Sequence, residues 1–450
     1  MIRGVSSVRV PKSRSKALAA LTAAAFLVVP GSGAQAKDII VHAGRLLDGT
    51  LRPVRSNISI VIKDDRIVSI TDGFVDAAGA EIIDLSHQTV MPGFIEAHDH
   101  LVLTNDRDDE KPRMMSSGEA YVRLVRNAYA EIANGFTSTR DCGSHMVDMK
   151  VIKYSIAKGR LIGPRIWAAL EPLGPVGGHS DPWNQEGGDT VSADEREHAL
   201  VHGADDARDK VREHFMRGAN LIKIMPSGGV SSLNDDPNAL TMTYEEIKAV
   251  VDAAHALGLK VAAHAIGLEA IKASVRAGVD SIEHGIFVDA DTLREMKAQG
   301  TFFDPTVLTA YVKLEAVRAN PSVYDPRVVA KGLKAWPLQI AVAETAHKMG
   351  VKIVMGTDQS SLGAGANKAD GIIRLVQAGL TPQEAIVAAT GTNADLIGSK
   401  DIGVIEAGRY ADIIAIDGDP LVRIEAVRNV QFVMKGGKVF KDHGQMAALP

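Results

Sequence analysis

Cysteine is almost absent from this chain of 450 residues, in which Cys142 is the only one. A single cysteine excludes an intramolecular disulfide and any zinc site of the CxxC type. A metal site in this protein must therefore use histidine, carboxylates or a rarer ligand.

Low-complexity sequence and a strong excess of one charge are also missing. The 42 glycines and 18 prolines are spread along the chain, and the hydrophobic and charged fractions of 46% and 23% are ordinary globular values. These values exclude a disordered or collagen-like chain. The formal net charge is −5 and no basic face is obvious, so nucleic acid is not an expected partner.

At ~150 residues per domain the length of the chain suggests three domains, although a single barrel can take about 250 residues or more.

The first 36 residues have the order of a secretory signal peptide. A basic segment is followed by an apolar stretch over 17–29 and then by Ala34-Gln35-Ala36, a small-residue cleavage signal. The apolar stretch of ~13 residues is too short to span a bilayer, which argues against the alternative of a membrane anchor. We therefore predict cleavage near Ala36 and an exported protein, periplasmic or secreted.

Removal of this segment changes the charge of the chain. It holds five basic residues and no acidic one, so 45 basic residues would face 55 acidic residues in the mature chain, a net charge of −10. No later segment reaches 18 uninterrupted apolar residues, so we expect no membrane span in the mature form.

Two β-rich ends flank a different middle. Residues 37–91 and 402–450 show the alternation and turn residues of short strands, and we predict one small β-sandwich built from both. In residues 92–401, strand and helix patterns alternate eight times, which predicts an α/β fold, a (β/α)8 TIM barrel. The strand candidates are 90–97, 135–141, 165–170, 221–225, 261–265, 281–283, 301–305 and 352–356.

The first barrel strand leads into His98-Asp99-His100. Because side chains alternate along a strand, the two histidines point the same way. They lie at the carboxyl end of the strand, where the active sites of such barrels lie. Two imidazoles at this spacing suit a divalent metal, although an isolated HxH is a weak signal.

Four further polar residues fall on the same predicted rim. His264, His284 and Asp358 end the fifth, sixth and eighth strands. Lys223 lies in the fourth strand, before the glycine-rich turn PSGGV. A buried lysine without a partner is costly, so its presence there requires a chemical reason.

The motifs PGFIEAHDH, KIMPSGGV, HAIG, IEHG and GTD resemble those of the amidohydrolase superfamily. Within it they are similar to the binuclear metal-dependent branch of prolidase-like and carboxypeptidase-like enzymes, which includes enzymes that cleave ochratoxin-type amides. The resemblance covers nearly all of the mature chain, including the split β-sandwich, and no ligand position departs from the binuclear pattern.

The resemblance implies a role for each rim residue. His98, His100 and Asp358 would hold one divalent metal, His264 and His284 the other, and carboxylated Lys223 would bridge them. Only a neutral lysine amine reacts with CO2, and burial near metal cations favours that form. The carbamate is an anionic oxygen ligand, and zinc is the metal we expect for this set.

The same resemblance implies the reaction. We expect metal-dependent hydrolysis of a peptide-like amide in dipeptides or N-acyl amino acids with a free C-terminal carboxylate, including ochratoxin-type amides. Asp358 would carry the proton from the attacking hydroxide to the leaving amine. A small molecule or a peptide is therefore the expected partner.

Four residues are candidates for substrate binding. His179 lies among glycines in GPVGGHSDPW, where the alternative is an ordinary surface histidine. Tyr311 could reach a substrate carboxylate, the alternative being helix packing. The backbone N–H groups of Gly228 and Gly229 could contact a ligand, the alternative being a plain turn.

Other functions stay open at this point. One alternative is a cyclic-amide or imidazolone-type C–N hydrolase, and another is a non-catalytic binding protein on the same fold. Related deaminases usually work with one metal and lack the bridging lysine, so Lys223 argues against that chemistry. The sequence leaves open the identity of the substrate and whether the chain forms a homo-oligomer.

Overall fold

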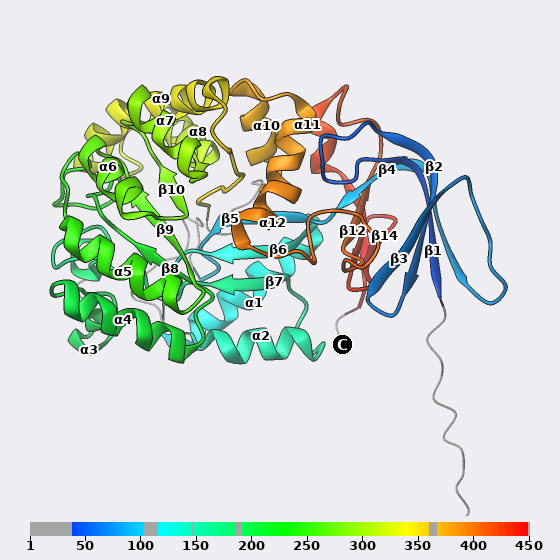
Figure 1. The fold of residues 1–450 in the computed structure, drawn as a ribbon, viewed down its shortest axis with the longest axis horizontal. Coiled ribbons are helices and arrows are strands. Elements are labelled where there is room, and N and C mark those ends of the chain that lie inside the picture. The colour runs from blue at the N-terminus through cyan, green and yellow to red at the C-terminus, as the bar shows by residue number, and fades with distance from the viewer. Residues whose placement is uncertain (1–37, 103–115, 146, 186–190, 360–366, 449–450) are drawn as a thin grey trace, which may run out of the picture. The chain divides into compact units, whose positions relative to one another are not determined.

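The structure, a computed structural model, describes residues 38–102, 116–145, 147–185, 191–359 and 367–448. The predicted signal peptide and its cleavage point near Ala36 lie outside these residues. Residues 37–450 form one compact unit, in which helices lie around a set of parallel strands (Figure 1).

Strands from both ends of the chain share one sheet of eight strands. β4 and β12 pair antiparallel, with Pro92 opposite Ile413, and this ladder joins the N-terminal strands to the C-terminal ones. The strand order is β15-β14-β13-β12-β4-β1-β2-β3. The strands are β1 (Ile39–Leu46), β2 (Arg55–Lys63), β3 (Arg66–Asp72), β4 (Glu81–Pro92), β12 (Ile413–Ile416), β13 (Val430–Lys435), β14 (Lys438–Asp442) and β15 (Gln445–Met446).

Alternation along these strands buries one set of apolar side chains. Ile58, Ile60 and Ile62 of β2 are fully buried, and they belong to the same hydrophobic cluster as Phe432 and Met434 of β13. The two ends of the chain therefore share one core, although they are more than 300 residues apart in sequence.

The middle of the chain contributes two parallel sheets. One has the order β5-β6-β7, and the other has the order β11-β10-β9-β8. The strands are β5 (Phe94–Asp99), β6 (Phe136–Asp141), β7 (Arg165–Ala168), β8 (Leu221–Ile224), β9 (Lys260–Ala265), β10 (Ser281–His284) and β11 (Phe302–Asp304).

The eighth strand candidate, 352–356, is not a regular strand. Ile353 makes an isolated bridge with Phe303, and the carbonyl of Met355 accepts a hydrogen bond from the N–H of Ala97 in β5. On the other side, a bridge between Leu173 and Ile224 joins the segment after β7 to β8. The segment 352–356 therefore contacts β11 of one parallel sheet and β5 of the other. With its parallel strands and helices, the fold is a mixed α/β fold.

Helices follow the parallel strands, as the alternation predicts. Local signals determine their ends: α5 begins with a capping box between Thr243 and Glu246, and α6 ends at Gly278 in the left-handed region. The helices are α1 (Ser117–Ala133), α2 (Met149–Ala157), α3 (Ala193–Glu197), α4 (Ala204–Arg217), α5 (Tyr244–Ala256), α6 (Leu268–Ala277), α7 (Ala290–Gln299), α8 (Val307–Ala319), α9 (Pro326–Met349), α10 (Asp370–Gln377), α11 (Pro382–Val387) and α12 (Asn393–Ile397).

The long α9 is half apolar but not a membrane helix. Within the described parts of the chain, no helix combines the length and the hydropathy needed to cross a bilayer. The parallel strands instead form the buried centre of the unit, and their carboxyl ends bring polar side chains together at one rim.

Candidate metal centre

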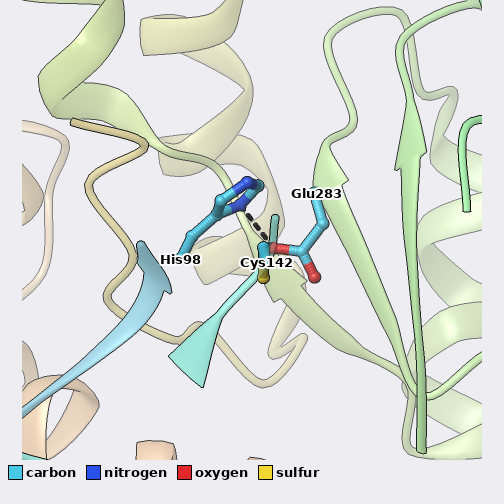
Figure 2. Close-up of side chains that lie close together, drawn as sticks. All are labelled: His98, Cys142 and Glu283. Carbon is cyan, nitrogen blue, oxygen red and sulfur yellow. Dashed lines mark hydrogen bonds and ion pairs between the residues drawn. The ribbon is translucent and has the colours of Figure 1, made fainter. Parts of the chain in front are cut away.

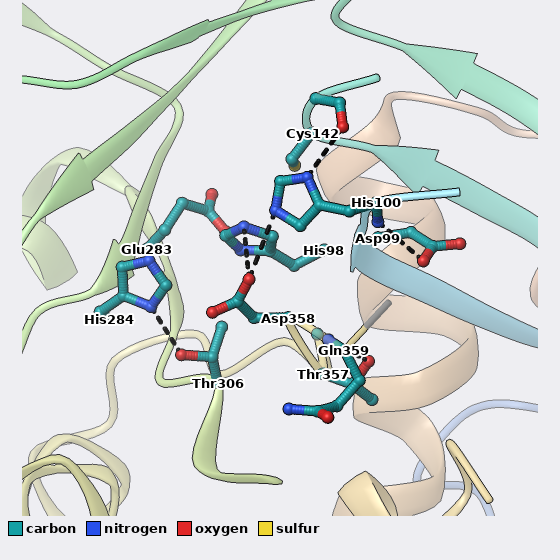
Figure 3. A network of polar contacts seen from close by, with 12 residues as sticks. His98, Asp99, His100, Cys142, Glu283, His284, Thr306, Thr357, Asp358 and Gln359 are labelled. Atoms are coloured by element: carbon teal, nitrogen blue, oxygen red, sulfur yellow. Dashed lines mark hydrogen bonds and ion pairs between the residues drawn. The ribbon is translucent and has the colours of Figure 1, made fainter. Parts of the chain in front are cut away.

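The rim residues that the sequence singled out line one cavity of about 240 Å³. They come from the carboxyl ends of β5, β8, β9 and β10 and from the end of the segment that follows α9. Figure 3 shows His98, His100, His284 and Asp358 of this set. The six residues are His98, His100, Lys223, His264, His284 and Asp358. Residues separated by up to 260 positions in sequence are thus brought to a single place.

A buried carboxylate on a neighbouring strand orients His98. Its Nδ1 lies 2.8 Å from Oε2 of Glu283 in β10. Arg140 of β6 donates from one guanidinium nitrogen to both carboxylate oxygens, at 2.9 Å each. Burial alone would raise the pKa of Glu283, but Arg140 and His98 lower it well below its usual value. The ionised carboxylate only accepts, so His98 donates from Nδ1 and keeps the lone pair of Nε2 for the cavity.

His100 and His284 have partners on Nδ1 as well. For His100 the partner is the carbonyl oxygen of Gly143 at 2.9 Å, which can only accept, so Nε2 keeps its lone pair. For His284 it is Oγ1 of Thr306 at 2.7 Å, a hydroxyl that also accepts from Gln339 Nε2 at 2.7 Å. The two lone pairs of that hydroxyl allow it to accept from both groups, which leaves Nε2 of His284 available.

His264 is oriented the opposite way. Its Nε2 lies 3.2 Å from the carbonyl oxygen of Gly228, so Nε2 donates and Nδ1 keeps the lone pair. The ring stacks on His179 with centroids 4.3 Å apart, and it meets His284 edge-on at 4.7 Å. His264 would therefore bind a metal through Nδ1, whereas His98 and His100 would use Nε2.

Burial keeps three of these rings neutral, which is the state that binds metal. Burial, followed by the charge of Lys223, lowers the pKa of His98 to about 4. Burial and the neighbouring imidazoles lower the pKa of His264 and of His284 well below the usual value. Burial would also lower the pKa of His100, but the hydrogen bond and charge of Asp358 raise it above its usual value.

The Asp358 carboxylate lies between the two histidines of the first motif. Its Oδ1 is 3.3 Å from Nε2 of His100 and 3.8 Å from Nε2 of His98 (Figure 3). Burial would raise the pKa of Asp358, but His100, His98 and His284 lower it well below its usual value. An ionised carboxylate thus faces the Nε2 atoms of two imidazoles, an arrangement that a shared cation, whether a proton on His100 or a metal ion, would stabilise.

Lys223 is deeply buried beside the same ring. It is 1% exposed, and its Nζ lies 3.0 Å from Nε2 of His98. Among the described residues, no carboxylate lies within ion-pair distance of this amine. An uncompensated ammonium at this depth would be costly, so the site suits a lysine that is neutral or converted to an anion.

Two groups of three potential ligand atoms lie within 4.8 Å of one another in the described part of the chain. One is His98, His100 and Asp358; the other is His98, Cys142 and Glu283 (Figure 2). The second group fits a metal poorly. Burial raises the pKa of Cys142 to about 12, which keeps the thiol protonated, and Glu283 is already paired with Arg140. We therefore infer that the second group does not bind a metal and that its Glu283 orients His98.

The predicted substrate contacts have mixed outcomes. His179 lines the cavity, and its Nδ1 lies 2.9 Å from Oγ of Ser232. Tyr311 is not among the described lining residues, because its ring packs under the guanidinium of Arg374 at 4.2 Å.

The glycine turn supports the site but does not line the cavity among the described residues. The N–H of Gly229 donates to Asp235 Oδ2 at 3.0 Å, so in this structure it is bonded within the protein. A Cβ at Gly229 would lie 2.0 Å from the ring of His179, which explains why glycine is needed there. The carbonyl of Gly228, rather than its N–H, takes part by orienting His264.

Sequence reasoning missed the residues that orient the ligands. Glu283 stands directly before His284 in the motif IEHG, so alternation along the strand places its side chain on the opposite face from His284. That position could have identified Glu283 as a residue that supports the ligands. Thr306 and Gln339 had no such signal, because Thr306 contacts His284 from the β11–α8 connection and Gln339 contacts Thr306 from α9. Lys313 and Trp336, which also line the cavity, were missed for the same reason.

Comparison with known sequences identifies the family. The amidohydrolase family profile matches residues 89–440. The chain is 28% identical over 438 residues to ochratoxinase from Aspergillus niger, which covers 93% of this chain and 89% of that protein. It is 23% identical over 398 residues to imidazolonepropionase from Pyrobaculum arsenaticum, a weaker match that covers 84% and 92%.

Comparison with solved structures finds relatives of the same kind. A Xaa-Pro dipeptidase with bound methionine in its active site superposes with a TM-score of 0.84 at 33% identity, covering 90% of this chain and 100% of that one. A prolidase complexed with N-methylphosphonate-L-proline superposes with a TM-score of 0.80 at 31% identity, over the same shares of the two chains. The family match and these structural neighbours imply a TIM-barrel-type α/β fold with a β-sandwich.

The role of Glu283 can be tested through metal affinity. Glu283→Gln should weaken metal binding by about 10- to 100-fold, because His98 loses the charge that fixes its tautomer. Competition with a chromogenic chelator measures the affinity, and circular dichroism restricts the comparison to folded protein. Glu315→Gln, at a carboxylate that is 61% exposed, is the matched control. Equal affinities in the two variants would contradict the assignment.

Proposed function

The chain belongs to the amidohydrolase family and is a metal-dependent hydrolase, and we propose that it cleaves the amide bond of dipeptides or N-acyl amino acids that carry a free C-terminal carboxylate. Ochratoxin-type amides belong to this class, since they join an acyl group to an amino acid. The ochratoxinase and the Xaa-Pro dipeptidase, which are similar to this chain over most of its length, support this choice.

One observation carries the proposal: six potential ligands converge on one cavity with their lone pairs facing it. His98, His100 and Asp358 would hold one divalent cation, and His264 and His284 a second. Lys223, carboxylated on Nζ, would bridge them. Zinc is the metal we propose for imidazole and carboxylate ligands. When bound, the cations would polarise the scissile carbonyl and activate water.

Proton transfer is assigned to Asp358. Its carboxylate is ionised and 3.3 Å from His100, so it can accept a proton from water and release it to the leaving amine. The hydrogen bond to Glu283 holds the ring of His98 in its orientation. His179, on the cavity wall, would contact the substrate.

We also propose the finer architecture. Residues 92–401 would form a closed (β/α)8 barrel, supported by the contacts of 352–359 with β5 and β11. Residues 37–91 and 402–450 would form the β-sandwich. Residues 1–36 would be removed as a signal peptide, which would place the mature enzyme in the periplasm or outside the cell.

Replacement of the proton carrier should stop turnover. Asp358→Asn removes the basic oxygen while keeping the shape of the side chain, so kcat should fall by about 100-fold or more. Steady-state kinetics on metal-loaded protein measure this, with metal content determined in parallel. Asp291→Asn, at a side chain that is 82% exposed, should keep wild-type kcat. A near-normal kcat in Asp358→Asn would rule out this role.

Removal of the bridging side chain should empty the site. Lys223→Ala should lose most of its bound metal, because no oxygen ligand would then join the two halves. Short carboxylates such as formate or acetate should restore part of the metal and part of the activity by occupying the vacated space. Lys334→Ala, at an exposed residue, serves as the control. Full metal retention in Lys223→Ala would refute the carbamate bridge.

The substrate class requires a direct screen. Metal-loaded wild-type protein should release amino acids from N-acyl amino acids or from X-Pro, X-Arg or X-Phe dipeptides, as detected by an amine-reactive reagent. Hydantoins, lactones and imidazolones belong in the same screen because of the weaker similarity to imidazolonepropionase. Hydrolysis of a cyclic compound without hydrolysis of any linear amide would overturn the proposal.

A further inference from the structure

A lysine on the wall of the cavity has no anionic partner among the described residues. Lys313 of α8 lines the cavity, and its Nζ donates to Oγ of Ser231 at 2.8 Å. Within the described ranges, no carboxylate lies within ion-pair distance of this amine. Ser231 lines the cavity as well and supplies only a neutral acceptor.

Two enclosed cations elsewhere in the described residues have carboxylate partners. Arg140 contacts both oxygens of Glu283, and Lys368 forms ion pairs with Asp99 and Glu131. The partly buried Lys313 differs from these two, because its described partner is a neutral hydroxyl. Because a desolvated charge is costly without an opposite charge, a ligand anion would stabilise Lys313.

Part of the lining of this cavity is apolar. Four hydrophobic side chains line the cavity and also belong to one buried cluster: Val230, Ile266, Ile286 and Trp336. Leu314, the residue after Lys313, packs into the same cluster. The same cavity therefore combines the ammonium of Lys313 and an apolar surface with the imidazoles and Asp358.

A substrate that matches this pattern has three parts. A carbonyl would face the ligand side chains, an anion would face Lys313, and an apolar group would contact the hydrophobic wall. The free α-carboxylate and the side chain of an apolar C-terminal amino acid supply the last two parts. A few placed polar groups on an apolar wall are the usual basis of such selectivity.

We propose that Lys313, positioned by Ser231, binds the α-carboxylate of the amino acid that leaves, and that Trp336 and Ile286 accommodate its apolar side chain. This inference rests on the proposed amide hydrolysis. It makes the enzyme an exopeptidase-like hydrolase that selects substrates with an apolar C-terminal residue. A blocked C-terminus would lack the anion, and the buried cation would then lose its partner.

The test compares two substrates that share a scissile bond. N-acetylphenylalanine carries the carboxylate, and N-acetylphenylalaninamide does not. The wild-type protein should prefer the acid in kcat/KM by about 10- to 100-fold, the size expected for a charge-assisted hydrogen bond. Lys313→Met should reduce this preference to near unity, and Lys313→Arg should restore part of it. Lys334→Met, in which an exposed lysine of α9 is replaced, should keep the wild-type preference.

A binding measurement separates this inference from the reaction. L-phenylalanine, the expected product, should bind the metal-loaded wild-type protein more tightly than Lys313→Met by about 10-fold or more in calorimetry. Metal content should be equal in the two proteins.

If Lys313→Met keeps both the acid preference and the affinity for phenylalanine, Lys313 does not bind the carboxylate, and the proposed hydrolysis still stands. If the wild-type protein hydrolyses no amide, the proposed function fails, and the calorimetric difference alone decides the role of Lys313. Equal affinities of the two proteins for phenylalanine would then overturn it.

Discussion

The Glu283 carboxylate lies between Arg140 and His98, and this buried contact joins the strands β10, β6 and β5. Figure 2 shows the contact between Glu283 and His98. Removing any partner would leave a buried group unpaired, which is costly. The contact also determines which nitrogen of His98 carries the proton. The ring can therefore present a lone pair beside Lys223 and Asp358, and the remaining ligands assemble around that point.

Backbone conformation contributes to the same geometry. His284, Thr306 and Asp358 have positive φ angles of 69°, 43° and 50°, which residues other than glycine rarely adopt. Each lies at or just after the carboxyl end of a strand or strand-like segment. His284 and Asp358 line the cavity, and the side chain of Thr306 contacts His284. Such conformations cost of order 1–3 kcal/mol each and persist where surrounding contacts hold them. The Thr306–His284 and Asp358–His100 contacts provide that support.

Much of the fold follows from local pattern. The alternation of strand and helix signals predicts the parallel strands and the helices, since hydrophobic periodicity and capping are properties of short segments. Seven of the eight strand candidates in the middle of the chain correspond to strands β5–β11. The segment 352–356 differs, because it makes isolated bridges in place of a continuous ladder, and ladder formation depends on neighbouring strands.

The sequence by itself determined the ligand candidates. Spacing along one strand predicts that His98 and His100 point the same way, and strand ends predict that the other candidates share their rim. Only the tertiary structure decided that Glu283 orients His98, that Gly229 makes room for His179, and that Lys313 faces the cavity. The physical reason is that a hydrogen bond, a close approach or an unpaired charge depends on the distance between elements remote in sequence, which no periodicity within one element encodes.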